Sequence, residues 1–239
     1  ILNPSKTVII PDMDAGCSLA DSAASKDFKT WVKKHPRHTL VSYINCSAEV
    51  KAMSDIICTS SNAEKIINSI PINQPILFAP DKFLGKFLIK QTKRDLILWD
   101  GYCQVHVMFS LKELVKLKIR YPKAKVIAHP ECEEKILNHA DFIGSTTGLI
   151  KYTQAAEADQ FIVVTEPGVI HQMKRLNPNK DYMPLANNEG CACNECPYMR
   201  LNTIDKMIHA LQTLEPEIIL SNDLIQKAKK PLNKMLELS

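Results

Sequence analysis

Short apolar segments rich in β-branched residues alternate along the chain with stretches in which apolar residues recur at helical spacing. Strands that are buried on both faces of a parallel sheet are apolar throughout, instead of alternating with polar residues. Strand–helix alternation of this kind predicts an α/β fold built on parallel sheets. The predicted strands cover residues 7–11, 39–44, 55–58, 75–79, 95–99, 125–129 and 160–165, with 142–143 as a short further strand.

Several helix starts are marked by residues whose side chains accept hydrogen bonds from unpaired backbone N–H groups. Ser110 and Glu113 form an S-x-x-E capping box before the apolar stripe of one helix. Pro231 is expected to interrupt or kink the last predicted helix, because proline lacks the N–H group that a helix needs. The other predicted helices begin at residue 47, span 62–70, and cover 201–214 and 224–236.

Side chains able to do chemistry gather at or just after the ends of the predicted strands. In open α/β sheets, ligands bind at the carboxyl ends of the strands. The sequence therefore predicts one functional edge, which several loops build together. The residues at this edge are Asp12, Asp14, Tyr43, Asn45, Thr59, Ser60, Asp81, Asp100, His129, Glu131 and Glu166.

Composition narrows the class of protein. The 239 residues are 45% hydrophobic and 23% charged, which is typical of a globular protein. The formal net charge of +4 is evenly spread and does not support nucleic-acid binding. No apolar run approaches the ~20 residues that span a bilayer. We therefore expect no nucleic-acid partner, no membrane segment, no secretion signal and a cytoplasmic location.

Eight cysteines occur, and in a chain expected to stay in a reducing compartment they are predicted to be thiols available for metal binding or catalysis. Cys191, Cys193 and Cys196 cluster within six residues, which favours metal ligation. Because no second C-x-x-C motif occurs, such a site must recruit remote residues or keep an open position. Cys17 and Cys103 follow predicted strands, whereas Cys46, Cys58 and Cys132 are interpreted as packed thiols.

The spacing of these cysteines indicates an internal repeat. Cys103 follows Cys17 by 86 residues, and Cys196 follows Cys103 by 93. Each interval holds several strand–helix units and is about the size of one small domain.

Two further motifs carry candidate chemistry. His129 and Glu131 pair an imidazole with a carboxylate at a strand end, so they are candidates for substrate binding and base catalysis. The alternative is a histidine and a glutamate on a solvated loop. Ser145 and Thr146 stand at a predicted helix start, where hydroxyl and backbone N–H groups can hold an anion. The alternative there is an ordinary helix start.

Taken in order, nine segments make the chain resemble the quinolinate synthase family across nearly all of its length. They are PDMDAGCSLADS, YINCSAEVKA, CTSSNA, APDKFLG, WDGYCQVH, AHPECE, ADFIGSTTG, VTEPGV and CPYMRLNT. The resemblance implies three pseudo-symmetric domains of three αβα layers around a central cavity, with a [4Fe–4S] cluster at its floor. By motif position the cluster ligands are Cys17, Cys103 and Cys196, while Cys191 and Cys193 are additional.

The resemblance also implies where the domains lie. Residues 1–17 would end the first α/β domain, 18–101 would form the second and 102–186 the third, and 187–239 would return to the first. Family members carry an upstream segment with His-x-Tyr and Gly-Asp-Ser motifs, so the first domain is expected to be incomplete here. The C-terminal helices from Leu201 onward are then expected to leave apolar stripes uncovered, and the activity of residues 1–239 alone is in question.

The reaction that the resemblance implies condenses iminoaspartate with dihydroxyacetone phosphate to give quinolinate for NAD biosynthesis. An iron without a protein ligand would act as a Lewis acid. By motif match, Tyr43 and Glu131 would bind substrate and transfer protons. The remaining substrate-binding residues would be Asn45, Ser60, His106, His129, Ser145 and Thr146. A functional link to L-aspartate oxidase is also implied.

Two other readings of the sequence lead to different classes of protein. A non-catalytic iron–sulfur or zinc protein of the same fold would keep the cysteines, but it has no use for Tyr43, Asn45 and Glu131. A doubly wound dehydrogenase is disfavoured, because no G-x-G-x-x-G follows a predicted strand and the chain has seven glycines.

Overall fold

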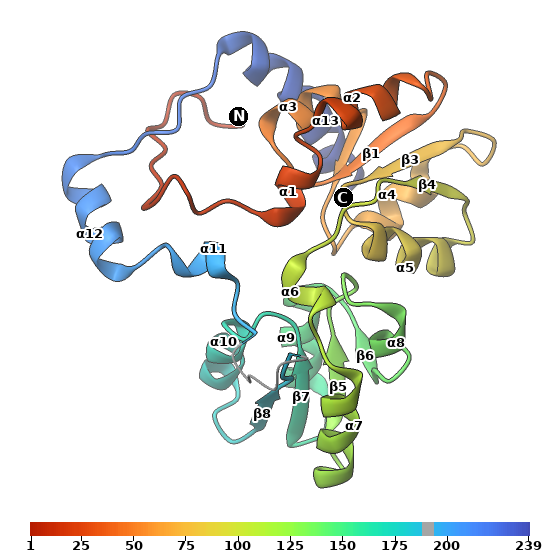
Figure 1. Ribbon diagram of the computed structural model, residues 1–239, viewed down its shortest axis with the longest axis vertical. Helices are drawn as coiled ribbons and strands as arrows, with labels where there is room; N and C mark the ends of the chain where they lie inside the picture. The colour runs from red at the N-terminus through yellow and green to blue at the C-terminus, as the bar shows by residue number, and fades with distance from the viewer. Residues whose placement is uncertain (188–193) are drawn as a thin grey trace. The chain divides into compact units, whose positions relative to one another are not determined.

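The apolar runs form two parallel sheets in the computed structural model, which describes residues 1–187 and 194–239 (Figure 1). Two compact units each contain one sheet and its own core. The first comprises Ile1–Gly101 and Cys196–Ser239, and the second comprises Tyr102–Glu195. Cys191 and Cys193, predicted to be additional thiols of a metal-binding cluster, lie outside the described residues.

The first unit has the strand order β2-β1-β3-β4, with every neighbouring pair parallel. The predicted α/β class with parallel sheets is confirmed. Each of the four strands lies within the residues predicted for it. In β2 and β3, burial on both faces is visible as a continuous apolar run. The strands are β1 (Thr39–Tyr43), β2 (Ile56–Cys58), β3 (Ile76–Ala79) and β4 (Leu96–Leu98).

Helices cover both faces of this sheet, which gives three layers. Val41 and Phe78 point to one face, where they pack with α4 (Ala63–Ser69) and α5 (Lys82–Thr92). Leu40 points to the other face. There it packs with residues of α2 (Lys26–Lys33) and α3 (Ala48–Met53).

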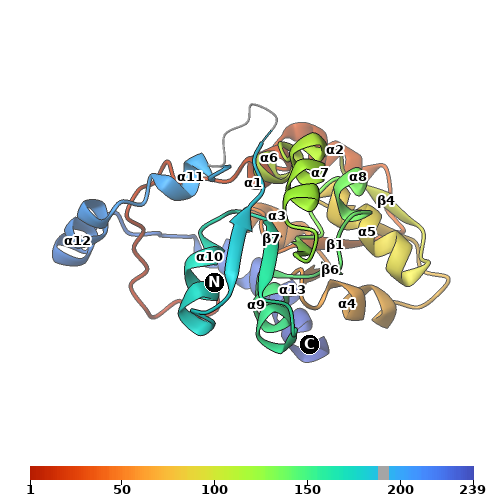
Figure 2. The same ribbon diagram turned by 90° about the horizontal axis from the view of Figure 1, so that it is seen from below.

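The second unit repeats this plan, with the strand order β6-β5-β7-β8 and parallel pairing throughout. Its strands are β5 (Lys125–Ala128), β6 (Phe142–Ile143), β7 (Gln160–Val164) and β8 (Asp181–Pro184). One face packs against α7 (Leu111–Arg120) and α8 (Glu134–Leu137). The other packs against α9 (Thr146–Ala155) and α10 (Val169–Leu176), which lie side by side (Figure 2).

The two sheets are therefore an internal repeat with a period of 86 residues at their first strands. Val41 and Ile127, which are 86 residues apart, both point to the face that carries the second and third connecting helices of their unit. Counting from this match, Cys17 corresponds to Cys103 and Cys46 to Cys132. The repeat expected from the cysteine spacing is thus present in the strand order, although few side chains are shared.

Predicted helix caps are present as hydrogen bonds. The Ser110 hydroxyl accepts from the Glu113 backbone N–H at 3.4 Å, and the Ser47 hydroxyl accepts from the Val50 N–H at 3.3 Å. Asn62 also occupies a cap position, but its Oδ1 accepts from the Thr59 N–H at 2.6 Å instead. Local capping chemistry therefore places the helix starts at Ser47 and Ser110 where the sequence predicts them, whereas Asn62 marks a helix start that its side chain does not cap.

The secondary structure differs from the prediction at three places. The segment 7–11 makes an isolated antiparallel bridge between Ile9 and Glu217, since a strand needs a longer pairing partner than this. The helix α13 (Asn222–Leu238) continues through Pro231 without interruption, held by packing of its buried face. The strand β8 was not predicted, because its four residues mix polar and apolar types and end in proline.

The C-terminal helices behave differently from one another. In α13, Leu232 and Met235 pack against Ile57 of β2, so the expectation of an uncovered stripe is wrong for this helix. In α12 (Ile204–Thr213) the stripe is uncovered as predicted, with Ile204 70% and Leu211 69% exposed. Figure 1 shows α12 apart from the sheet of its unit. Among the described residues, no helix is both long and apolar enough to cross a membrane.

Candidate active site

A buried polar cluster lies at the carboxyl end of the sheet in the second unit. His129 and Glu131 follow β5, Thr165 follows β7, and His106 comes from the short helix α6 (Gln104–Val107). The chain leaves β5 toward β6 on one side, whereas β7 lies on the other side of β5. Crevices form where strand order reverses in this way, and ligands bind there in open α/β sheets.

Glu131 is the centre of this cluster. Its Oε2 lies 3.0 Å from His106 Nδ1, and its Oε1 lies 3.6 Å from His129 Nδ1. The two imidazole rings stack, with centroids 4.9 Å apart and an angle of 23° between their planes. His106, His129 and Glu131 are 7%, 4% and 3% exposed. The alternative of a histidine and a glutamate on a solvated loop is therefore wrong.

The surroundings shift the pKa values of the two histidines in opposite directions. Burial opposes protonation of His106, but the Glu131 carboxylate and the Cys103 thiol outweigh it and raise the pKa of His106 to about 10. Burial, with the repulsion from His106 added, lowers the pKa of His129 to about 4 although Glu131 opposes this. At neutral pH the cluster thus holds a protonated His106 paired with Glu131, beside a neutral His129.

Cys103 borders the same cluster. Its sulfur, an imidazole nitrogen of His106 and a carboxylate oxygen of Glu131 all lie within 4.8 Å of one another. Thiolate and imidazole are good ligands for transition metals, and a carboxylate beside them can also move a proton. The chemistry of these donors fits both a metal site and a site of proton transfer.

The other two candidate cluster ligands, Cys17 and Cys196, stand at the start of a short helix, as Cys103 does. Cys17, Cys103 and Cys196 each directly precede a short helix and are partly exposed, at α1 (Ser18–Ser22), α6 and α11 (Pro197–Arg200). In the first unit, a Cβ added to Gly16 would lie 3.7 Å from the Tyr198 ring. The loops that carry Cys17 and Cys196 are therefore adjacent.

Cys46, Cys58 and Cys132 differ from these three, because all are buried in the cores, as their interpretation as packed thiols predicts. Burial raises the pKa of Cys46 and of Cys58, so both stay protonated at neutral pH. Only a thiolate is a good metal ligand. Among the described cysteines, the partly exposed thiols are thus the three predicted cluster ligands, and the buried thiols are the three that the sequence analysis interpreted as packed.

The remaining candidates lie at the carboxyl ends of strands in their own units. Tyr43 ends β1 and is buried, Asn45 is exposed, and Ser60 follows β2 and is half-buried. In the second unit the Ser145 hydroxyl accepts from the Gly148 N–H at 3.1 Å and so caps α9, while Thr146 is exposed. The structure brings together Cys103, His106, His129 and Glu131, and leaves Ser145 occupied by a helix cap.

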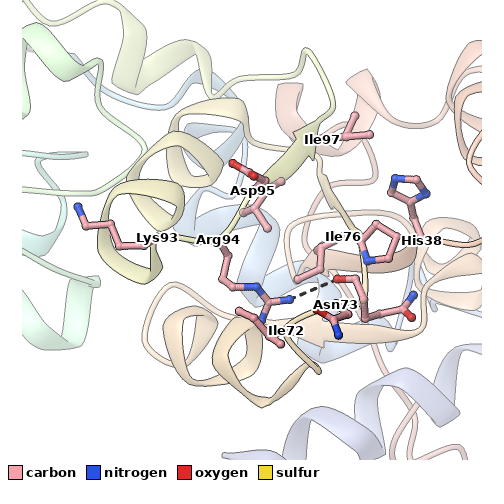
Figure 3. A pocket seen from close by; sticks show the side chains of 11 residues that line it. His38, Ile72, Asn73, Ile76, Lys93, Arg94, Asp95 and Ile97 are labelled. Carbon is pink, nitrogen blue, oxygen red and sulfur yellow. Dashed lines mark hydrogen bonds between the residues drawn. The ribbon is translucent and has the colours of Figure 1, made fainter.

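A pocket with a cavity volume of about 410 Å³ lies at the opposite edge of the first sheet, at the amino ends of β3 and β4 (Figure 3). Arg94 in its wall donates to the carbonyls of Ile70 and Pro71 at 2.8 and 3.0 Å. These bonds hold the turn that leads into β3. No candidate from the carboxyl ends of the strands lines this pocket.

Thr165 is the member of the buried cluster that the sequence did not single out. It closes an apolar run and was therefore assigned to the predicted strand 160–165. A hydroxyl residue at the carboxyl end of such a run, just before Glu166, is the signal that would have identified it.

Parallel α/β units with a buried histidine–glutamate pair beside a thiol define an enzyme of the α/β class with a metal-compatible site. A family model described as "Quinolinate synthetase A protein" matches residues 1–237. The chain belongs to this family, as the resemblance predicts.

Curated relatives agree. The quinolinate synthase of Nostoc sp. (strain PCC 7120) is 56% identical over all 239 residues, which cover 74% of that relative. The quinolinate synthase of Synechocystis sp. (strain PCC 6803) is 54% identical over the same residues, which cover 75% of it. That of Cyanophora paradoxa is 54% identical, with 73% covered.

Proposed function

We propose that this chain supplies the active site of a quinolinate synthase, which condenses iminoaspartate with dihydroxyacetone phosphate and releases phosphate and water. Family membership supports the reaction, and the buried His106–Glu131 pair beside Cys103 is the observation that carries its chemistry. The reaction needs proton transfer and stabilisation of anions but no net oxidation or reduction.

Cys17, Cys103 and Cys196 would hold a [4Fe–4S] cluster. Their partial exposure at the start of short helices fits this role, whereas the packed Cys46, Cys58 and Cys132 do not fit it. A cluster with three protein ligands supplies a Lewis-acidic iron when it is bound. Because thiols and such clusters survive best in a reducing compartment, the proposal includes a cytoplasmic location.

Glu131 and Tyr43 would transfer protons during ring formation. Glu131 is buried and forms an ion pair with His106, so its carboxylate is held in one place and shielded from water. Tyr43 is the last residue of β1 in the first unit, so it lies at the carboxyl end of a strand, where ligands bind in this class of fold. A phenol and a carboxylate can give and accept protons at successive steps.

The substrates carry carboxylates and a phosphate, and the donors near the strand ends match these anions. A protonated His106 offers charge, while Ser60, Thr146 and Asn45 offer hydrogen bonds. His129 and Ser145 complete the proposed binding set. Since two-electron oxidation of aspartate yields iminoaspartate, we also propose a functional link to L-aspartate oxidase.

The test is formation of quinolinate by the complete natural protein that contains residues 1–239. The protein would be purified without oxygen and given dihydroxyacetone phosphate, with iminoaspartate generated in the assay from oxaloacetate and ammonia. We expect quinolinate from the wild type and a loss of at least ~10²-fold in Tyr43→Phe, with iron retained in both.

A protein that is fully loaded with iron and forms no quinolinate would favour the second candidate, a non-catalytic iron–sulfur protein of the same fold. The buried ion pair of Glu131 and His106 speaks against that candidate, because burying charged groups costs free energy that a simple metal scaffold need not spend.

A further inference from the structure

Thr165 contacts His106, and the proposed reaction assigns no role to this contact. It lies just after β7, is 5% exposed, and its Oγ1 is 3.1 Å from Nε2 of His106. The contact joins residues that are 59 positions apart in the chain. A buried hydroxyl costs free energy unless it is hydrogen-bonded, so this partner accounts for a polar side chain at a buried position.

The geometry points to Thr165 as a positioning residue that sets the orientation of the His106 ring, and through it the Glu131 carboxylate, for the proposed ring-forming reaction. This inference rests on the proposed function. His106 is held at both nitrogens, by Glu131 at Nδ1 and by Thr165 at Nε2. The ion pair at Nδ1 alone leaves the ring angle loosely defined, whereas the added hydrogen bond at Nε2 restricts rotation of the ring.

Glu131 and Thr165, the two partners of the His106 ring, follow different strands of one sheet, which fixes their separation. Glu131 follows β5 and Thr165 follows β7, and the ladder between these strands includes the pair Ala128–Val164. The backbone N–H of His129 extends the ladder by donating to the Val164 carbonyl at 3.1 Å. Because the strand ends cannot shift independently, the distance between these two partners is set by the sheet.

The hydroxyl is also suited to this role chemically. It can accept a hydrogen bond from Nε2–H or donate one to a bare Nε2, so it serves either tautomer of the ring. Valine has nearly the same shape and can do neither. The contact therefore depends on the hydroxyl group and not on the volume of the side chain.

The internal repeat provides a comparison within the same chain. In the first unit, Ser42 pairs with Ala79 as Ala128 pairs with Val164 in the second. The residue after Ala79 is Pro80, which stands where Thr165 stands. The first unit therefore forms the same sheet without a hydroxyl at this position. The sheet itself does not require Thr165, so its hydroxyl must serve another role.

The experiment compares Thr165→Val, Thr165→Ser and a matched control in the complete natural protein. The control is Thr153→Val, because Thr153 is fully buried in the same unit and its hydroxyl donates only locally in the described contacts, to the Ile150 carbonyl at 2.8 Å. All three variants are measured for iron content, melting temperature, kcat and KM, and crystal structures of the wild type and Thr165→Val give the His106 ring angle.

We expect Thr165→Val to lower kcat by about 10- to 100-fold, the usual effect of removing a group that orients an active-site ligand. KM should rise as well, because His106 belongs to the proposed substrate-binding set. Thr165→Ser should restore kcat to within about threefold of the wild type, since it keeps the hydroxyl. Thr153→Val should keep the wild-type kcat.

The inference is overturned if Thr165→Val keeps the wild-type kcat, if Thr165→Ser is as slow as Thr165→Val, or if the His106 ring does not turn in the Thr165→Val crystal. Failure of the proposed function is a different result, in which the iron-loaded wild type makes no quinolinate. The ring angle still decides the orienting role of Thr165 in that event.

Discussion

Asp55 and Asp141, which are 86 residues apart, make the same pair of contacts in the two units. Asp55 Oδ2 accepts from the Leu40 N–H at 2.8 Å, and its own N–H donates to the Leu40 carbonyl at 2.9 Å. Asp141 Oδ2 accepts from the Val126 N–H, also at 2.8 Å, and its N–H donates to the Val126 carbonyl at 2.8 Å. Each aspartate thereby ties the start of an edge strand to the strand beside it.

The two sites differ in one charge, which leads to a prediction about pH. Lys125 Nζ donates to Asp141 Oδ1 at 2.9 Å, whereas Thr39 stands at the position of Lys125 in the first unit. Burial would raise the pKa of Asp141, but the Val126 N–H and Lys125 outweigh it, and the pKa is lowered. A carboxyl with a lowered folded-state pKa adds stability above its unfolded pKa of about 3.9, and this is lost as pH falls through the folded value.

We therefore expect Asp141→Asn to cost no more than about 1 kcal/mol at pH 7, because the ion pair is partly exposed and the amide oxygen still accepts from Val126. The difference in the free energy of unfolding between wild type and variant should shrink as pH falls below about 4. Urea unfolding from pH 7 down to pH 3 measures it. A difference that stays constant over this range would show that Asp141 does not gain stability from ionisation.

The proposed cluster ligands are tested by iron content. Replacing Cys17, Cys103 or Cys196 with serine should each abolish iron binding, because a hydroxyl is a poor substitute for a thiolate. Protein purified without oxygen should otherwise be brown and carry about four irons per chain.

Cys132→Ala is the matched control for the cysteine variants, since Cys132 is in the same unit as Cys103 and is fully buried. It should lose some stability and keep its iron. Wild-type iron content in Cys103→Ser would remove Cys103 from the ligand set.

Glu131→Gln tests proton transfer. The amide keeps the size of the side chain but cannot accept a proton, so kcat should fall by at least ~10²-fold while iron content and the visible spectrum are retained. The measurement is quinolinate formation alongside the absorption spectrum. Glu133→Gln is the control, because Glu133 is a nearby carboxylate that pairs with Lys135 instead. Equal turnover in Glu131→Gln and the wild type would exclude Glu131 as the acid or base.

Arg94 is predicted to be a stability residue and not a binding residue. Its guanidinium is buried and donates to four backbone carbonyls, those of Ile67, Ile70, Pro71 and Gln74. Arg94→Ala should destabilise the protein by about 2–4 kcal/mol, because it leaves carbonyls without their donor. Urea unfolding measures the change.

Lys93 provides the control for Arg94, because it is the next residue, is exposed, and has a φ of 57°. Lys93→Gly should change stability by less than about 1 kcal/mol, since glycine relieves the left-handed conformation while adding freedom to the unfolded chain. If Arg94→Ala is as stable as Lys93→Gly, the four hydrogen bonds contribute nothing measurable.

The sequence by itself determined the parallel α/β class, most of the strands, several helix caps and the family. Each of these depends on neighbouring residues. Burial on both faces makes the strand residues 161–164 apolar throughout, and Ser110 caps a helix through a residue three positions away. The assignment of Cys17, Cys103 and Cys196 as the ligand set came from the family resemblance, because the packed cysteines also lie near strand ends.

Tertiary structure decided the features that depend on distant residues. The continuation of α13 through Pro231 is held by packing on Ile57, which no local rule for proline includes. Pairing with β7 makes a strand of the mixed segment Asp181–Pro184. His106 meets Glu131 and Thr165 because parallel strands align their carboxyl ends. A site assembled from three separate segments cannot be predicted from any one of them.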